Sequence, residues 1–444
     1  MDNKKSLLIS QKIDKSLVGE IEVAPDKSIS HRSLIFAALG YGQSKITGLL
    51  EGHDVICTAQ ALKLMGIEIE RGFDETINKP VWTVNGRGVF GLAQPQDILD
   101  MGNSGTAARL LAGLVSSRNM VSTFTGDESL RGRPMKRIFD PIREIGGEIT
   151  ARDGNFMPFT ITGAKNPLPI DYEMKIASAQ VKSAILLAAL NIPGKTTIIE
   201  PNKCRDHTEI MMKYLGLDIN VEKFGENGTK ISYAGMQEYD AKNFEVPGDI
   251  SSAAFIIVAA LIVKGSKITI KNVGINPLRD GIIITLQEMG GNIELVNQRE
   301  VCGEKVADIV VESSNLKGIK VPASRAPSMI DEYPILSIAA SFASGVTIME
   351  GLEELKVKES NRLLMIAQNL EKCGVSLVMK DDSLEVRGGI TQPKDIARIT
   401  TSHDHRIAMS FYIMGLMLEN GVQIDDSSMI ATSFPNFLEI FKGL

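Results

Sequence analysis

Apolar and polar positions follow one order of elements that is first visible near the start of the chain. The stretch Val23–Ser33 reads as a short strand, a turn marked by proline and the opening of a helix, which the apolar run Leu34–Leu39 continues. Ser28 or Ser30 is placed to cap this helix, because a hydroxyl at a helix start accepts from backbone amides that have no partner within the helix. The pattern therefore predicts a strand, a turn and a capped helix.

Two cations belong to the same turn. Lys27 and Arg32 would lie beside the free amides and the positive end of the helix dipole. Such an arrangement suits a phosphate or a carboxylate. One copy is weak evidence, because capped helices are common, so the argument depends on repetition.

The elements that follow complete a repeating unit. Residues 44–48 read as a strand, 54–65 as an amphipathic helix, and 67–70 with 81–84 as a hairpin. The order is strand, helix, strand, helix, strand, strand. It begins again near residues 100, 176, 244, 321 and 399, which makes six copies in an α/β chain.

Six copies divide as three plus three, which is consistent with two domains. The sixth copy ends at Leu444, too early for its closing strands, and residues 6–13 or 19–23 at the N-terminus offer one. We therefore expect one domain of residues 1–22 plus 244–444 and an inserted domain of residues 23–243. We place the active site in the cleft between them, since pockets form preferentially at domain interfaces.

Composition agrees with two large domains and excludes several kinds of partner. The chain has 444 residues and a net charge of −6, so nucleic acid is not an expected partner. Four cysteines without CxxC spacing indicate reduced thiols in a cytoplasmic protein. The apolar run Ala253–Val263 is about half of the ~20 residues that a membrane span needs, and the first apolar run stops at Ile9, too soon for a signal peptide. We expect a cytoplasmic monomer that binds small molecules and does not associate with a membrane.

Four ordered motifs resemble one family. They are Lys27-Ser28 with Arg32, the segment Gly102–Arg109, the segment Leu130–Met135 and the segment Val357–Leu363. Together they resemble the 3-phosphoshikimate 1-carboxyvinyltransferase (EPSP synthase) family of enolpyruvyl transferases, and the likeness covers essentially the whole chain. The resemblance implies two similar domains, each of three repeated units, that close around the substrates.

The resemblance also implies the reaction. The enolpyruvyl group of phosphoenolpyruvate moves to the 5-hydroxyl of shikimate 3-phosphate, and phosphate leaves, by addition and elimination through a tetrahedral intermediate. This step belongs to the shikimate pathway, toward chorismate and the aromatic amino acids. The family needs no metal, and we expect no cofactor.

Both substrates carry a phosphate and a carboxylate, so the site must gather anions, and arginine forks suit both groups. The resemblance implies that shikimate 3-phosphate is bound by Lys27, Ser28, Arg32, Ser178, Ala179 through its backbone, Gln180, Arg205, Asp331 and Lys358. It implies that phosphoenolpyruvate is bound by Lys27, Asn103, Gly105, Thr106, Arg133, Gln180, Arg362 and Arg406.

Two carboxylates are assigned the proton transfers by the same resemblance. Asp331 is the expected base on the 5-hydroxyl, and Glu359 handles the proton on the methylene carbon, with Lys27 as a further acid. The chemistry requires such groups, because the hydroxyl loses a proton as the vinyl carbon gains one.

Structural roles remain open for several of these residues. Ser28 and Ser178 are also suitable helix caps, and Asp331 would favour a helix dipole from the first turn. Glu359 and Arg362 are spaced as an ordinary surface pair on a helix.

Three other features also have plain interpretations. Arg109 is placed either to brace its loop or to touch substrate. The His403-Asp404-His405 spacing fits a helix cap better than a metal site. The segment Asn103–Thr106 lacks the Gly-Lys-Ser/Thr ending of a nucleotide P-loop, which argues against a kinase.

At two positions, Thr432 and Gly105, this chain differs from other family members in ways that concern inhibition by glyphosate. Many family members carry a lysine where this chain has Thr432, and segments 205–208 and 329–334 resemble a bacterial subgroup in which threonine is usual. The resemblance implies that glyphosate competes for the phosphoenolpyruvate site, against the loop that contains Gly105. Tolerant members of that subgroup carry alanine there, so Gly105 predicts a glyphosate-sensitive enzyme.

Two rival functions remain. The sister enzyme that acts on UDP-N-acetylglucosamine carries a reactive cysteine in a mobile loop, and the corresponding residues 126–135 contain none. The other rival is a repeat-built protein that binds a phosphorylated metabolite without turnover.

Overall fold

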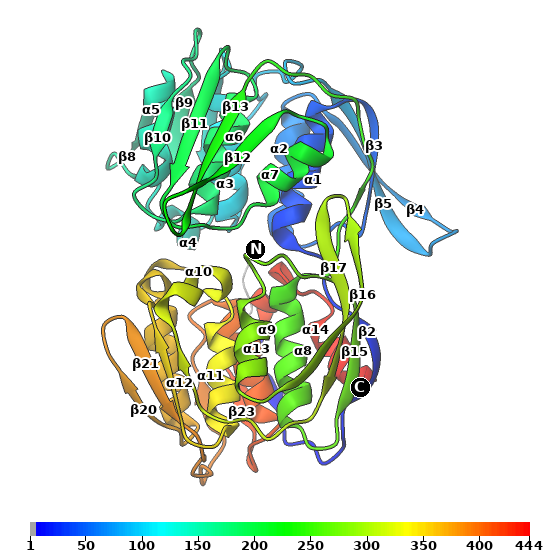
Figure 1. The fold of residues 1–444 in the computed structure, drawn as a ribbon, viewed down its shortest axis with the longest axis vertical. Coiled ribbons are helices and arrows are strands. Elements are labelled where there is room, and N and C mark those ends of the chain that lie inside the picture. The colour runs from blue at the N-terminus through cyan, green and yellow to red at the C-terminus, as the bar shows by residue number, and fades with distance from the viewer. Residues whose placement is uncertain (1–5) are drawn as a thin grey trace. The chain divides into compact units, whose positions relative to one another are not determined.

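The computed structural model describes residues 6–444, which form two compact units (Figure 1). Unit 1 consists of the N-terminal segment up to Ala24, Pro247–Arg299 and Lys305–Leu444, and unit 2 of Pro25–Val246 and Glu300–Glu304. Residues 1–5, with which the first expected domain begins, lie outside the described residues.

The described residues of unit 2 form three four-stranded sheets. In spatial order they are β14 (Phe244–Glu245), β3 (Tyr41–Thr47), β5 (Lys79–Arg87), β4 (Glu68–Asp74); β6 (Leu99–Asp100), β7 (Val121–Thr125), β9 (Phe156–Thr162), β8 (Glu148–Arg152); and β10 (Asp171–Glu173), β11 (Lys195–Glu200), β13 (Gly228–Ala234), β12 (Ile219–Phe224). The helices are α1 (Lys27–Leu39), α2 (His53–Leu64), α3 (Gly105–Ser116), α4 (Glu128–Arg131), α5 (Lys136–Ile145), α6 (Ala179–Ala189) and α7 (His207–Tyr214).

Unit 1 also has three sheets within the described residues. They are β16 (Asn292–Val301), β17 (Glu304–Glu312), β15 (Lys267–Gly274), β2 (Val18–Glu22); β18 (Lys320–Val321), β19 (Val346–Glu350), β21 (Ser383–Arg387), β20 (Ser376–Met379); and β1 (Leu8–Ser10), β23 (Val422–Ile424), β22 (Ala397–Ile399). The helices are α8 (Ile250–Ile262), α9 (Gly281–Glu288), η1 (Ala323–Arg325), α10 (Ala326–Met329), α11 (Tyr333–Phe342), η2 (Glu353–Val357), α12 (Arg362–Lys372), α13 (His405–Gly415), η3 (Ser428–Thr432) and α14 (Phe437–Gly443).

The sheets repeat one pairing rule. The first strand of a repeat lies parallel to the second, the second antiparallel to the fourth, and the fourth antiparallel to the third, as in β10-β11-β13-β12. In the last repeat, β22 lies parallel to β23, and β1 takes the fourth strand's place, antiparallel to β23. The prediction that the N-terminus supplies a strand to the sixth copy is therefore confirmed.

Two strands are exchanged between repeats. β2 precedes α1 in the chain, but it pairs parallel to β15 in unit 1. β14 precedes α8, but it pairs parallel to β3 in unit 2. The two similar stretches around residues 21–30 and 244–252 are thus two of the places where the chain passes from one unit to the other.

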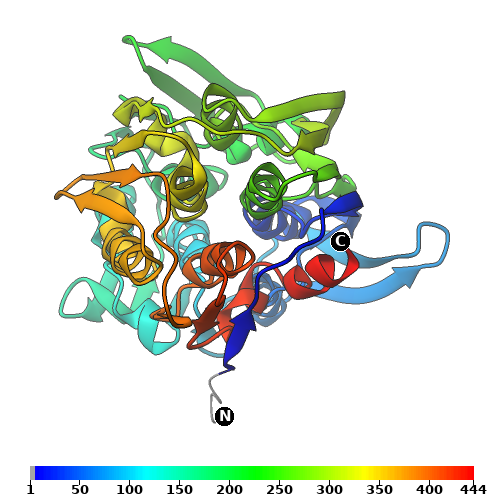
Figure 2. The same ribbon diagram turned by 90° about the horizontal axis from the view of Figure 1, so that it is seen from below.

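Helices form the centre of each unit, with sheets outside them (Figure 1). In unit 1, α8, α11 and α13 lie side by side, and Figure 2 shows them almost end-on in green, yellow and orange-red. The predicted buried helix is α8, which Asp249 caps and which is buried from Ile250 to Leu261. Within residues 6–444, no helix combines the length and the apolar character that crossing a membrane requires.

Candidate active site

The first helix begins earlier than the sequence suggested, because its cap lies two residues before Ser28. Asp26 is the cap of α1, and its Oδ1 accepts from the Ile29 amide at 2.8 Å. Ser30 instead donates to the Asp26 carbonyl at 2.8 Å and accepts from the Leu50 amide at 3.0 Å. The expectation that Ser28 or Ser30 caps α1 was wrong. Both serines lie within the helix, whereas Asp26 has the extended backbone of a cap residue and a carboxylate that accepts from the Ile29 amide.

Lys27, the first residue of α1, forms an ion pair with Asp54 from the first turn of α2. The lysine side chain is 22% exposed and that of Asp54 is 5% exposed. The buried carboxylate therefore holds the ammonium at the start of α1, and part of the lysine side chain stays exposed.

Arg32 is buried, and neutral oxygens hold its guanidinium. Its Nε donates to Thr208 Oγ1 at 2.8 Å, one terminal nitrogen to Ser183 Oγ at 2.7 Å and the other to the Ser28 carbonyl at 2.9 Å. Burial lowers the pKa of Arg32 to about 10, and the nearby cation Arg205 acts in the same direction. A guanidinium oriented by hydroxyls and a carbonyl keeps its charge for an anion.

The loop before α3 is organised around Arg133. Ser104 caps α3 by accepting from the Ala107 amide at 3.1 Å. Arg133 donates to Asn103 Oδ1 at 2.6 Å and to Ser129 Oγ at 3.1 Å. Like Arg32, Arg133 is held by neutral acceptors, which suits a role in anion binding.

Gln180, at the start of α6, joins two parts of this loop. Its Oε1 accepts from Arg109 at 3.0 Å, and its Nε2 donates to Thr106 Oγ1 at 3.0 Å. Arg109 also donates to the carbonyls of Gly105 at 3.3 Å and Pro134 at 3.2 Å. In the structure, Arg109 thus braces the loop.

The other predicted residues of unit 2 lie at the starts of α6 and α7. Ser178 caps α6, with its Oγ 3.5 Å from the Val181 amide, and Ala179 is the first residue of that helix. Arg205 lies in the segment that leads into α7. The cap interpretation therefore holds for Ser178, which leaves its predicted substrate role as a proposal.

In unit 1, Arg362 is bonded to three carboxylates. Its Nε donates to Asp404 at 2.7 Å, one terminal nitrogen to Asp331 at 3.0 Å and the other to Glu359. Burial opposes the charged form, but the three carboxylates raise the pKa of Arg362 above its ordinary value. We call these four residues the Arg362 cluster.

Exposure within the Arg362 cluster is graded. The side chain of Arg362 is 1% exposed, whereas those of Asp331 and Glu359 are 14% and 23% exposed. The arginine thus lies behind two carboxylates that remain accessible. Glu359 and Arg362 are therefore not an ordinary surface pair, because the arginine is buried. The carboxylate of Asp331 faces the guanidinium of the same arginine. Lys358 lies 4.0 Å from Asp331.

Arg406 adjoins the same group. It donates to the Asp331 carbonyl at 3.3 Å and lies 3.6 Å from Glu332 Oε1. Asp404 caps α13 by accepting from the Arg406 amide at 3.0 Å, so the cap interpretation of His403-Asp404-His405 is confirmed. Across residues 6–444, no three metal-ligating side chains are arranged to hold an ion.

The side chain of Thr432, where many relatives have lysine, bonds within the 3₁₀ helix η3 that contains it. Its Oγ1 donates to the Met429 carbonyl at 2.7 Å. The hydroxyl thus has a local structural role.

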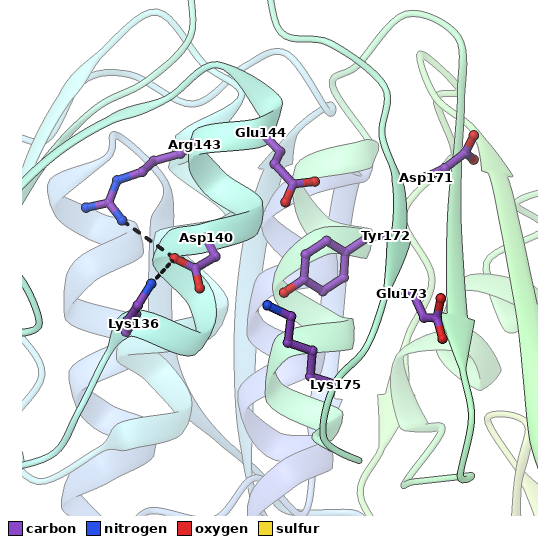
Figure 3. A pocket seen from close by; sticks show the side chains of 8 residues that line it. All are labelled: Lys136, Asp140, Arg143, Glu144, Asp171, Tyr172, Glu173 and Lys175. Atoms are coloured by element: carbon purple, nitrogen blue, oxygen red, sulfur yellow. Dashed lines mark hydrogen bonds and ion pairs between the residues drawn. The ribbon is translucent and has the colours of Figure 1, made fainter.

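A surface cavity of about 420 Å³ lies elsewhere in unit 2 (Figure 3). It is lined by Lys136, Asp140, Arg143, Glu144, Asp171, Tyr172, Glu173 and Lys175. Lys136 and Arg143 both pair with Asp140 along α5. None of the predicted site residues lines this cavity, so we do not assign it to the reaction.

A family model described as EPSP synthase (3-phosphoshikimate 1-carboxyvinyltransferase) matches residues 11–441. The chain belongs to the EPSP synthase family. It is 52% identical to 3-phosphoshikimate 1-carboxyvinyltransferase of Paramagnetospirillum magneticum (strain AMB-1). The alignment spans 428 residues and covers 96% of this chain and 95% of the relative. It is 51% identical over 434 residues to that of Brucella abortus (strain S19), which covers 97% and 94%.

A solved structure of EPSP synthase from Acinetobacter baumannii has the same fold. It is 41% identical, with a TM-score of 0.86 over 98% of each chain. The resemblance seen in the motifs and the predicted fold class are therefore confirmed. The roles of single residues stay proposals for this member of the EPSP synthase family.

Several partners in these networks were missed from the sequence. Asp54 and Asp404 contact Lys27 and Arg362, but nothing in their spacing relates them to those residues. Asp26 was visible as an aspartate directly before Lys27, and an aspartate is as good a cap as serine. The pairs that were missed are those formed between distant segments.

Proposed function

We propose that this chain transfers the enolpyruvyl group of phosphoenolpyruvate to the 5-hydroxyl of shikimate 3-phosphate and releases phosphate. The Arg362 cluster carries this proposal. Its buried guanidinium holds Asp331 and Glu359 as two partly exposed carboxylates bonded to one group. The reaction needs two such groups, because one proton leaves a hydroxyl while another reaches carbon.

In the addition step, Asp331 takes the proton of the 5-hydroxyl as its oxygen bonds to C2 of phosphoenolpyruvate. Glu359, or Lys27 as a further acid, supplies a proton to the methylene carbon, which becomes a methyl group. In the elimination step, Glu359 removes a proton from this methyl group. The bond between C2 and the phosphate oxygen then breaks, the carbon–carbon double bond re-forms, and phosphate leaves.

Anion binding is assigned to cations in both units. Arg32 and Arg133 of unit 2 are oriented by neutral acceptors and are therefore suited to shikimate 3-phosphate and phosphoenolpyruvate, respectively. In unit 1, Arg406 adjoins the carbonyl of Asp331. We propose that both groups of residues act on the same pair of substrates.

The deciding experiment measures phosphate release. We expect release with phosphoenolpyruvate plus shikimate 3-phosphate and none with phosphoenolpyruvate plus UDP-N-acetylglucosamine. Asp331→Asn and Glu359→Gln should each lower kcat by roughly a hundredfold to ten-thousandfold, the range for general acid–base groups. Asp381→Asn, at an exposed carboxylate of the same unit, is the control. Retained turnover in both variants would contradict the assigned roles.

We also propose a monomer in the cytoplasm. The cysteines at positions 57, 204, 302 and 373 are free thiols, which a reducing compartment maintains. Light scattering coupled to size exclusion would contradict the monomer if it gave twice the mass of 48.2 kDa.

A further inference from the structure

A buried lysine lies in unit 2 among four elements. The side chain of Lys182, on α6, is 1% exposed. Its Nζ lies 2.8 Å from Glu209 on α7 and 3.1 Å from each carboxylate oxygen of Glu200, at the end of β11. Glu200 also accepts from Thr229 on β13 at 2.7 Å. One ammonium therefore joins two helices to a sheet.

The same ion pair fixes the backbone immediately before Arg205. The Cys204 amide donates to Glu200 Oε1 at 2.8 Å, and the Cys204 carbonyl accepts from Lys182 Nζ at 3.2 Å. Both polar backbone groups of this residue are thus held by buried charged groups, to which hydrogen bonds are stronger than to neutral ones. The direction in which the chain enters Arg205 depends on Lys182 and Glu200.

The neighbours of the buried charges in the sequence hold Arg32. Ser183 follows Lys182, and Thr208 precedes Glu209. These two hydroxyls accept from Arg32, and they lie 2.7 Å from each other. The Lys182–Glu209 pair therefore fixes the separation of α6 and α7 where both helices contact Arg32.

The charged form of Lys182 is favoured in this buried setting. Burial opposes the ammonium, but Glu209 and Glu200 raise the pKa of Lys182 above its ordinary value. Burial raises the pKa of Glu209, while Lys182 opposes that rise. Removing the lysine alone would leave Glu200 and Glu209 buried without their cation, which is strongly destabilising.

We propose that Lys182 is a positioning residue for shikimate 3-phosphate, acting through Arg205 and Arg32 from behind the site. The proposal rests on the proposed function, since it assumes that these two arginines bind that substrate. It assigns Lys182 no contact with substrate. Its effect is therefore specific to one of the two ligands.

The first test replaces Lys182 by methionine, whose unbranched side chain is one heavy atom shorter than that of lysine and carries no charge. We expect Lys182→Met to raise the dissociation constant of shikimate 3-phosphate, measured by calorimetry without phosphoenolpyruvate, by roughly tenfold or more. Arg118→Met is the matched control. Arg118 is a buried cation of the same unit that donates to the carbonyls of Leu114 and Val89, away from the predicted site. It should lower the melting temperature and leave affinity for shikimate 3-phosphate unchanged.

A second variant decides the question if Lys182→Met does not fold. Glu200→Gln keeps the volume and one acceptor for the Cys204 amide, but it turns an amide group toward Lys182 or Thr229. We expect a smaller loss of affinity for shikimate 3-phosphate with the KM for phosphoenolpyruvate nearly unchanged. A folded Glu200→Gln protein with wild-type affinity would overturn the proposal.

A double-mutant cycle separates positioning from general loss of structure. In an Arg205→Ala background, Lys182→Met or Glu200→Gln should cost less affinity than in the wild type, because part of its route to the ligand is already gone. Full additivity would overturn the route through Arg205. A wild type that does not bind shikimate 3-phosphate would instead reject the proposed function, so the two failures are distinguishable.

Discussion

Glu332 Oε1 lies 3.6 Å from the guanidinium of Arg406, and the glutamate is fully buried. The same oxygen accepts from Ser251, which in turn accepts from Arg279 at 2.7 Å. Arg279 also bonds Asp249, the cap of α8, at 2.9 Å. A chain of buried polar groups therefore connects the start of α8 to a cation proposed to bind phosphoenolpyruvate.

We predict that Glu332→Gln raises the KM for phosphoenolpyruvate more than that for shikimate 3-phosphate. Glutamine keeps an acceptor for Ser251 but removes the charge that orients Arg406. The difference between a charge-assisted and a neutral contact is about 1–2 kcal/mol, or roughly 5–30-fold.

Glu288→Gln is the matched control for this change. Glu288 is bidentate to Arg325 in the same unit, and neither residue belongs to the predicted site. A Glu332→Gln protein with a lower melting temperature and an unchanged KM for phosphoenolpyruvate would show that Glu332 serves only the fold.

Arg133→Ala and Arg406→Ala should both weaken phosphoenolpyruvate more than shikimate 3-phosphate. Each removes a charge-assisted contact of roughly 1.5–3 kcal/mol, about tenfold to a hundredfold in affinity. Arg32→Ala should show the reverse preference. Equal losses for both ligands in calorimetry would mean that these arginines are assigned to the wrong substrate.

The repeats were predictable from sequence because each is built from local signals. Apolar runs, turn residues and glycines at helix ends recur in one order, and even the strand β1 could be expected from the shortened last copy. The sheets that β2 and β14 join could not be predicted. Which sheet a strand joins depends on packing between distant segments, and the two strands precede similar helices.

The residues of the candidate site also fall into a group that the sequence predicted and a group that it did not. The motifs indicated Lys27, Arg32, Arg133 and Arg362, and the family resemblance added Arg406. The partners that orient them come from elsewhere in the chain. Lys27 pairs with Asp54 across 27 positions, and Arg362 with Asp404 across 42. Only the fold brings these residues together, so the sequence identifies the cations but not the groups that hold them.

Asp280 should make the protein less stable as the pH rises from 5 to 7. Burial raises the pKa of this carboxyl to about 6, although its own backbone, Arg325 and Lys305 oppose the rise. An aspartate in the unfolded chain has a pKa of about 3.9, so between ~4 and ~6 the folded state binds more protons than the unfolded state. Stability is therefore lost as the pH rises through this window.

Asp280→Asn removes this dependence. We expect its melting temperature, relative to wild type, to be higher at pH 7 than at pH 5. Asp280 is half-buried, so solvent screening reduces the effect to about 1 kcal/mol. Asp395→Asn, at an exposed carboxylate of the same unit, is the control. An equal offset from wild type at both pH values would contradict the assignment.

Gly105 lies where a methyl group would meet two arginines. A Cβ at this position would be 2.6 Å from a terminal nitrogen of Arg109 and 3.5 Å from one of Arg133. Arg109 therefore borders the space next to Gly105. A methyl group on residue 105 would disturb the hydrogen bonds that Arg109 donates to Gln180 and to the Gly105 carbonyl. The nearest atom is the end of a flexible side chain, so an alanine fits at this position if Arg109 moves.

We propose that the wild type is glyphosate-sensitive, in competition with phosphoenolpyruvate. Gly105→Ala should raise the inhibition constant much more than the KM, because the inhibitor is longer than the substrate and needs the space next to Arg133. Arg109→Ala distinguishes two causes. If the methyl acts by displacing Arg109, this variant alone should reproduce the tolerance, and if the methyl itself meets the inhibitor, it should stay sensitive. A wild type that ignores millimolar glyphosate would mean that another feature, such as the brace formed by Arg109, already closes that space.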